Sequence, residues 1–130
     1  MSRQRRQVLV LDDDAGCRDV LSLVFESVGY EVKALANAAI GLALLRSWRA
    51  DLIVLDWVMP DLDGAAFLAE QQRDGIAAIP VLVLTASRLD GAAKALGASA
   101  IVFKPFNLDE LLATSARLLG PDPGQADAEC

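Results

Sequence analysis

The stretch ADLIVLDWVMPDLDG, residues 50–64, contains the pattern that decides the fold. Four apolar residues, Leu52 to Leu55, are followed directly by the carboxylate of Asp56. Such a short, continuous apolar run is typical of a strand that is buried on both faces. An unpaired buried carboxylate is costly, so Asp56 needs water, a cation or hydrogen-bond donors. Two interpretations stay open at this point: a strand that simply ends at solvent, or a carboxylate at the mouth of a site.

Four further segments have the composition of strands. They are QVLVLDDD (7–14), YEVKALA (30–36), IPVLVLTA (79–86) and SAIVFKP (99–105). Segments with helical spacing separate them. A strand followed by a helix, five times over, predicts βαβ crossovers and a mainly parallel sheet with helices on both faces. The sequence therefore predicts an α/β fold.

Five helices are expected along the chain. They are placed after Asp14 and over Ala38–Trp48, Gly64–Asp74, Asp90–Leu96 and Leu108–Leu119. The first is expected to end at Gly29 and to place five apolar residues on one face: Val20, Leu21, Val24, Phe25 and Val28. The expected N-cap residues are Asp14, Asn37, Asp63 and Asn107.

Composition narrows the range of functions. The length of 130 residues fits one compact domain, which we expect at residues 1–120, with a flexible polar tail or the start of a linker at 121–130. The net charge of -6 argues against direct binding to nucleic acid or anionic membranes, and no apolar run reaches the length of a membrane span. Cys17 and Cys130 form neither a disulfide framework nor a metal spacing, so we expect reduced thiols and a cytoplasmic location. The absence of histidine excludes histidine-based catalysis and histidine metal ligands within this chain.

Polar side chains stand at the ends of four expected strands. Asp12 and Asp13 end the first, Asp56 the third, Thr85 the fourth and Lys104 the fifth. In parallel sheets, ligands bind beyond the carboxyl ends of the strands. Grouped carboxylates suit Mg²⁺ or Ca²⁺, and a lysine with a threonine can hold anionic oxygens. This combination fits phosphoryl transfer, with Asp56 as the candidate nucleophile and the two N-terminal aspartates as candidate metal ligands.

Four motifs together resemble those of a known family. They are VLVLDDD (8–14), LIVLDWVMPDLDG (52–64), VLVLTAS (81–87) and FKPF (103–106). In their order and broad spacing, from about Gln7 to Leu119, the chain resembles the receiver domain of the response regulators of two-component signalling. The resemblance implies a doubly wound (βα)5, flavodoxin-like fold, whose parallel five-stranded sheet has the order 2-1-3-4-5.

The resemblance also implies a phosphoacceptor site that uses Mg²⁺. Asp56 would accept a phosphoryl group from a histidine of a sensor histidine kinase or a phosphotransfer protein. The implied Mg²⁺ ligands are Asp13, Asp56 and the backbone carbonyl of Val58, with Asp12 acting through water. Thr85 and Lys104 would bind the phosphoryl oxygens.

Several further expectations come with this family. The Lys104–Pro105 peptide bond would be cis. The domain would catalyse only its own aspartate phosphorylation and dephosphorylation, and would not be an enzyme in the wider sense. Phosphorylation would switch binding to a downstream protein, or to a C-terminal output domain if the chain is a fragment.

Other functions fit the residues less well. A phosphatase of the haloacid dehalogenase class would need a second acid at residue 58, which is Val58, and no glycine-rich nucleotide-binding motif occurs. A phosphorylation-independent, receiver-like interaction module stays open as the alternative. Ile101 stands where family members often carry Tyr or Phe, and the segment Thr85–Gly97 is about one helical turn shorter than usual. We therefore expect phosphorylation to change the order of residues 86–97 and not the rotamer of residue 101.

Overall fold

Five parallel strands form one sheet at the centre of the structure, a computed structural model that describes residues 5–57, 59, 64–73, 78–86 and 97–120. The strands are β1 (Gln7–Leu11), β2 (Glu31–Leu35), β3 (Leu52–Asp56), β4 (Val81–Thr85) and β5 (Ala100–Phe103). Their order across the sheet is β2-β1-β3-β4-β5, and every pairing is parallel. The expected α/β fold and strand order are confirmed.

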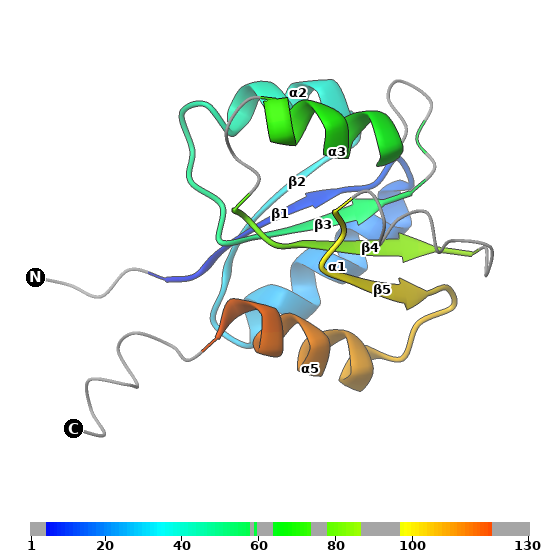
Figure 1. The fold of residues 1–130 in the computed structure, drawn as a ribbon. Helices are drawn as coiled ribbons and strands as arrows, with labels where there is room; N and C mark the ends of the chain where they lie inside the picture. The colour runs from blue at the N-terminus through cyan, green and yellow to red at the C-terminus, as the bar shows by residue number, and fades with distance from the viewer. Residues whose placement is uncertain (1–4, 58, 60–63, 74–77, 87–96, 121–130) are drawn as a thin grey trace, which may run out of the picture.

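Helices cover both faces of the sheet (Figure 1). The helices α2 (Ala38–Leu44) and α3 (Gly64–Arg73) lie over one face. The helices α1 (Ala15–Ser27) and α5 (Leu108–Leu119) lie over the other. None of the helices in the described part of the chain is both long and apolar enough to cross a membrane.

Alternating strand side chains build a separate core on each face of the sheet. The core under α2 and α3 includes Leu9, Leu11, Ile53 and Leu55. The core under α1 and α5 includes Val8, Val10, Leu52 and Val54. Because β3 and β4 are buried along their whole length, their sequences read as continuous apolar runs and not as alternating ones.

The register of the strands brings four polar residues to one edge, which we call the carboxyl edge. β1 and β3 end in register, so Asp12 and Asp56 leave the sheet next to each other. Thr85 is the last residue of β4, and the backbone N–H of Lys104, after β5, donates to the carbonyl of Thr85 over 2.8 Å. The edge was predicted from the strand ends, and the pairing shows why it forms.

Three helix caps lie at the residues that the sequence predicts, but one helix ends earlier than predicted. Asp14, Asn37 and Asn107 each accept a backbone N–H in the first turn of α1, α2 and α5, as predicted. The α2 helix ends at Leu44 and not at Trp48. Its backbone tightens there, with the N–H groups of residues 46 and 47 bonding three residues back, and the Trp48 ring packs against the core under α2 and α3.

The apolar face predicted for α1 is too wide. Leu21 and Phe25 are fully buried, but Val20 and Val28 are 46% and 50% exposed. Val20 lies one position, or about 100°, from Leu21 around the helix and so turns away from the sheet, whereas Val28 is the C-cap residue beyond the end of α1. Gly29 ends the helix as expected, with φ at 97°.

Some expectations fall on residues outside the described part of the chain. These are the helix at Asp90–Leu96, the cap at Asp63, the carbonyl of Val58 and the tail at 121–130.

Candidate functional site

Three carboxylates meet at the carboxyl edge. Asp12, Asp13 and Asp56 each offer one oxygen, and these oxygens all lie within 4.8 Å of one another. Asp12 is fully buried and Asp56 is 9% exposed, whereas Asp13 faces solvent. Like charges at this separation repel unless a cation joins them. Three hard oxygen ligands without sulfur or imidazole fit Mg²⁺ or Ca²⁺, with a side open to water.

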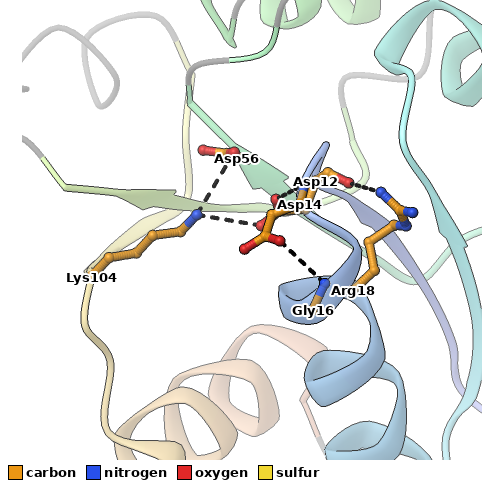
Figure 2. Close-up of polar contacts among 6 residues, drawn as sticks. All are labelled: Asp12, Asp14, Gly16, Arg18, Asp56 and Lys104. Carbon is orange, nitrogen blue, oxygen red and sulfur yellow. Dashed lines mark hydrogen bonds and ion pairs between the residues drawn. The ribbon is translucent and has the colours of Figure 1, made fainter.

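A lysine ammonium partly balances this charge (Figure 2). Lys104 Nζ lies 3.4 Å from Asp12 Oδ2 and 3.7 Å from Asp56 Oδ2. Both distances exceed the roughly 2.7–2.9 Å of a close charge-assisted bond, so the ammonium is shared between the two carboxylates. Burial alone would lower the pKa of Lys104, but the charges of Asp56 and then Asp12 raise it above its ordinary value. The ammonium therefore stays charged at neutral pH.

Four contacts fix Asp12 in place. Its Oδ1 accepts the backbone N–H of Asp14 over 2.9 Å, and its carbonyl accepts Nη1 of Arg18 over 2.8 Å (Figure 2). Its side chain also hydrogen-bonds the Cys17 thiol and faces Lys104. A buried carboxylate surrounded by donors in this way cannot rotate freely, which sets the geometry of the acidic cluster.

The Cys17 thiol stays protonated at neutral pH despite its position beside the cluster. Burial, the hydrogen bond to Asp12 and the negative charge of Asp12 together raise the pKa of Cys17 to about 12. A thiol is a nucleophile and a metal ligand only as the thiolate. Cys17 therefore acts here as a neutral partner of Asp12.

The peptide before Pro105 and the hydroxyl of Thr85 complete the edge. The Lys104–Pro105 bond is cis, as the resemblance implies. Thr85 is buried at the end of β4, with Asp56 on the neighbouring strand. The edge thus offers a carboxylate, an ammonium and a hydroxyl in one place, a set that can handle a phosphoryl group.

A family model for the response regulator receiver domain matches residues 8–116. The chain belongs to this family. Receiver domains are signalling modules of two-component systems and are generally not enzymes.

Among the curated relatives, the DNA-binding dual master transcriptional regulator RpaA of Synechocystis is 35% identical, over 87% of this chain and 48% of its own length. The phosphate regulon regulator PhoB of Pseudomonas aeruginosa is 32% identical, over 95% of this chain and 56% of its own. The chain thus spans about half the length of these curated relatives.

Solved receiver structures match the fold closely. The chemotaxis response regulator CheY4 of Vibrio cholerae has a TM-score of 0.82 and 32% identity, covering 88% of this chain and 99% of that one. The receiver domain of sensor histidine kinase PA1611 of Pseudomonas aeruginosa was solved with a magnesium ion coordinated in its active site cleft. That domain has a TM-score of 0.82 and 25% identity, covering 91% of this chain and all of its own.

The glycine that begins α3 has a packing role. Gly64 has no positive φ, so backbone freedom is not its purpose. A Cβ at this position would overlap the Trp57 ring, and the Gly64 N–H donates to the Trp57 carbonyl over 2.9 Å. Gly64 is therefore required for close packing on Trp57, the residue directly after Asp56.

Sequence reasoning missed two neighbours of the acidic cluster. It assigned no role to Arg18 or Cys17, although both lie one helical turn after the aspartates, where side chains can point back to the strand end. That spacing is the signal that could have found them. Ile101 on β5 is partly buried and packs against the core under α2 and α3, so the position lies inside the domain.

Proposed function

We propose that this domain, at residues 1–120, accepts a phosphoryl group on Asp56. The observation that carries the proposal is the placement of Asp56 at the end of β3, among two other aspartates and 3.7 Å from the Lys104 ammonium. A carboxylate at neutral pH is a competent nucleophile once its charge is balanced. The residues predicted from the sequence are thus close enough to act together.

The acidic cluster suits a Mg²⁺ ion. In our proposal Asp13, Asp56 and the carbonyl of Val58 bind the ion directly, and Asp12 binds through water. The three convergent carboxylate oxygens support this ligand set, as does the ion reported for the PA1611 receiver. When bound, the ion would supply positive charge that offsets the negative charge of the carboxylates and of the phosphoryl group.

The chain's own residues perform the transfer. A carboxylate oxygen of Asp56 attacks the phosphorus of a phosphohistidine on a donor protein. An O–P bond forms, the P–N bond breaks, and the leaving imidazole takes a proton from water. Lys104 moves from the two carboxylates toward a phosphoryl oxygen, and Thr85 donates its hydroxyl to another. Because the pKa of Lys104 is raised, its charge is present throughout the neutral range.

The partners follow from this chemistry. The donor is a sensor histidine kinase or a phosphotransfer protein, in keeping with a chain that has no histidine of its own. The receiver of the signal is a downstream protein, or an output domain in a longer chain. We propose a cytoplasmic location and no direct contact with nucleic acid or membrane, in line with the net charge of -6. Catalysis is limited to phosphorylation and dephosphorylation of the domain's own aspartate.

Incubation with acetyl phosphate and Mg²⁺, followed by intact-mass spectrometry, tests the proposal. We expect a gain of one phosphoryl group, mapped by peptide analysis to Asp56 and lost when a chelator removes the metal. No mass gain would contradict the proposal and favour the phosphorylation-independent interaction module. A gain on another residue would contradict the assignment of Asp56.

A further inference from the structure

A cleft opens at the edge of the sheet opposite the carboxyl edge. It has a volume of about 520 Å³ and lies where the chain enters β3 and β4. Figure 1 shows these amino ends of the strands far from the arrowheads that lead to Asp56. Its lining includes Leu45, Trp48, Arg49, Ala50, Ile79 and Pro80, and we call it the amino-edge cleft. Its volume falls within the roughly 300–1,000 Å³ of small-molecule sites.

The floor of the amino-edge cleft is apolar, and two of its backbone carbonyls are already paired. Leu45 and Ala50 belong to the core under α2 and α3, and Ile79 packs on that core. The Ile79 carbonyl accepts Nε2 of Gln71 over 3.0 Å. The Pro80 carbonyl accepts the backbone N–H of Ile53 in β3, also over 3.0 Å. An apolar group placed here would displace water without stripping these backbone groups of partners.

The carboxylate of the cleft has a hydrogen-bond partner, while one of its cations has none among the described residues. Asp51 Oδ2 accepts the backbone N–H of Gln7 over 2.8 Å. Within the ranges that the structure describes, the Arg49 side chain is exposed and makes no hydrogen bond or ion pair. Arg46 comes two residues after the end of α2, where a cation complements the helix end, but Arg49 lies beyond that turn. Helix capping therefore does not account for Arg49.

Positively charged residues are part of the lining of this cleft, and one more contacts its indole. Lys33 Nζ lies 5.4 Å from the centroid of the Trp48 ring, and Arg46 and Arg49 flank Trp48 in the chain. One cation thus contacts a partly buried aromatic ring, and two more line the same cleft, in a chain whose net charge is -6. A guanidinium binds carboxylate, sulfonate or phosphate oxygens through two parallel hydrogen bonds. Cations beside an open apolar floor suit a ligand that has both an apolar body and an acidic group.

We propose that the amino-edge cleft binds a small organic anion. Its planar apolar body lies on the floor formed by Leu45, Ala50 and Ile79, against Trp48. Its acidic group pairs with the Arg49 guanidinium. This site does not depend on the proposed phosphoryl transfer, because it shares no side chain with the carboxyl edge.

The probe 8-anilinonaphthalene-1-sulfonate has the required chemistry, an aromatic body with one sulfonate. NMR titration of the whole chain can follow the two indole N–H signals, of Trp48 and Trp57, assigned through Trp48→Phe. We expect a saturable shift of the Trp48 signal while Trp57 stays in place. Saturating Mg²⁺ with beryllofluoride should not displace the probe. A shift of Trp57 alone, or no saturable shift, would overturn the proposal.

Two matched controls distinguish binding at this site from nonspecific electrostatic or hydrophobic binding of the probe. Arg49→Gln should weaken binding by about tenfold or more, the size of a lost charge-assisted contact. Arg73→Gln removes an equal charge from an exposed residue of α3 that pairs with Glu70, and should change affinity by less than about twofold. The uncharged analogue N-phenyl-1-naphthylamine should bind equally to wild type and Arg49→Gln. Equal effects of the two arginine changes, or an Arg49 effect on the uncharged analogue, would overturn the role of Arg49.

Discussion

The two edges of the sheet carry charge in opposite ways. At the carboxyl edge, Asp12 and Asp56 are buried together and share one lysine ammonium. At the amino edge, Arg49 is exposed beside an open cleft, and Asp51 is tied to the backbone of β1. Water screens exposed charges strongly and buried charges little. At the carboxyl edge, single charges therefore affect the stability of the fold strongly. At the amino edge of the same strands, they affect it little.

The largest effect is expected from Asp56→Asn. The amide is a poor nucleophile, so phosphoryl transfer from acetyl phosphate should fall to background. Asp51→Asn is the matched control, because it makes the same chemical change just before the other end of β3 and should keep acceptance intact. Both variants can be compared by intact-mass spectrometry. Retained acceptance in Asp56→Asn, or loss in Asp51→Asn, would break the contrast between the edges.

The alkylation rate of Cys17 measures how strongly the carboxyl edge disfavours an additional negative charge, the thiolate. In a Cys130→Ser variant, where Cys17 is the sole cysteine, iodoacetamide at pH 8 should react about two to three orders of magnitude slower than with the urea-unfolded chain. The reason is the pKa, raised from 9.0 to about 12, which keeps the thiol neutral. Because the folded pKa is the higher one, this group contributes stability that is full below about pH 9 and lost as the pH rises through about 12.

Equal alkylation rates for the folded and unfolded chains would contradict this environment. A Cys17→Ser variant checks the specificity of the label, since it should not react at all when Cys130 is also replaced.

Asp13→Asn should have opposite effects on metal binding and on stability. Loss of one of three carboxylates should lower Mg²⁺ affinity by at least about tenfold, since even changes around metal ligands cost about that much. Without metal, one repulsive charge is gone, so the melting temperature should rise by about 1–4 °C. Trp57 fluorescence and calorimetry measure the binding, and thermal unfolding in a chelator measures the stability. A lower melting temperature in the chelator would count against repulsion within the cluster.

Much of the carboxyl edge could be predicted because it depends on order along the chain. Short apolar runs identify strands, and parallel pairing then brings their last residues to one edge, which is how Asp12, Asp56 and Lys104 were grouped. The caps Asp14 and Asn107 carry a local chemical signal of the same kind. Both inferences need only near neighbours and a topology rule. The roles of these residues in phosphoryl transfer stay predictions.

Features that depend on packing at a distance were not predictable in the same way. The end of α2 at Leu44 and the exposed Val20 depend on which side chains the sheet can cover, and one helical pattern fits several answers. The role of Gly64 depends on where the Trp57 ring falls. The amino-edge cleft is also invisible in the sequence, because its walls come from segments about 30 residues apart.

Gly64→Ala tests how tightly the carboxyl edge is packed. An added methyl group would overlap the Trp57 ring, so we expect a loss of about 1–3 kcal/mol in the free energy of unfolding. The matched control is Gly16→Ala in α1, where the nearest atom to an added Cβ lies 3.7 Å away and alanine favours the helix. Urea denaturation measures both. A cost at Gly16 as large as that at Gly64 would remove the packing explanation.

The smallest effect is expected from Arg49→Gln on stability. An exposed side chain without a partner among the described residues contributes no pairing energy to the folded state, so the free energy of unfolding should change by less than about 0.5 kcal/mol. Arg18→Gln is the informative counterpart, because it is the same substitution at a residue whose guanidinium donates to the Asp12 carbonyl. It should lower the free energy of unfolding by more, about 1–3 kcal/mol. Urea denaturation at neutral pH and moderate salt compares the two. A loss at Arg49 equal to that at Arg18 would mean that the amino edge also uses its charges to hold the fold, and the contrast between the edges would fail.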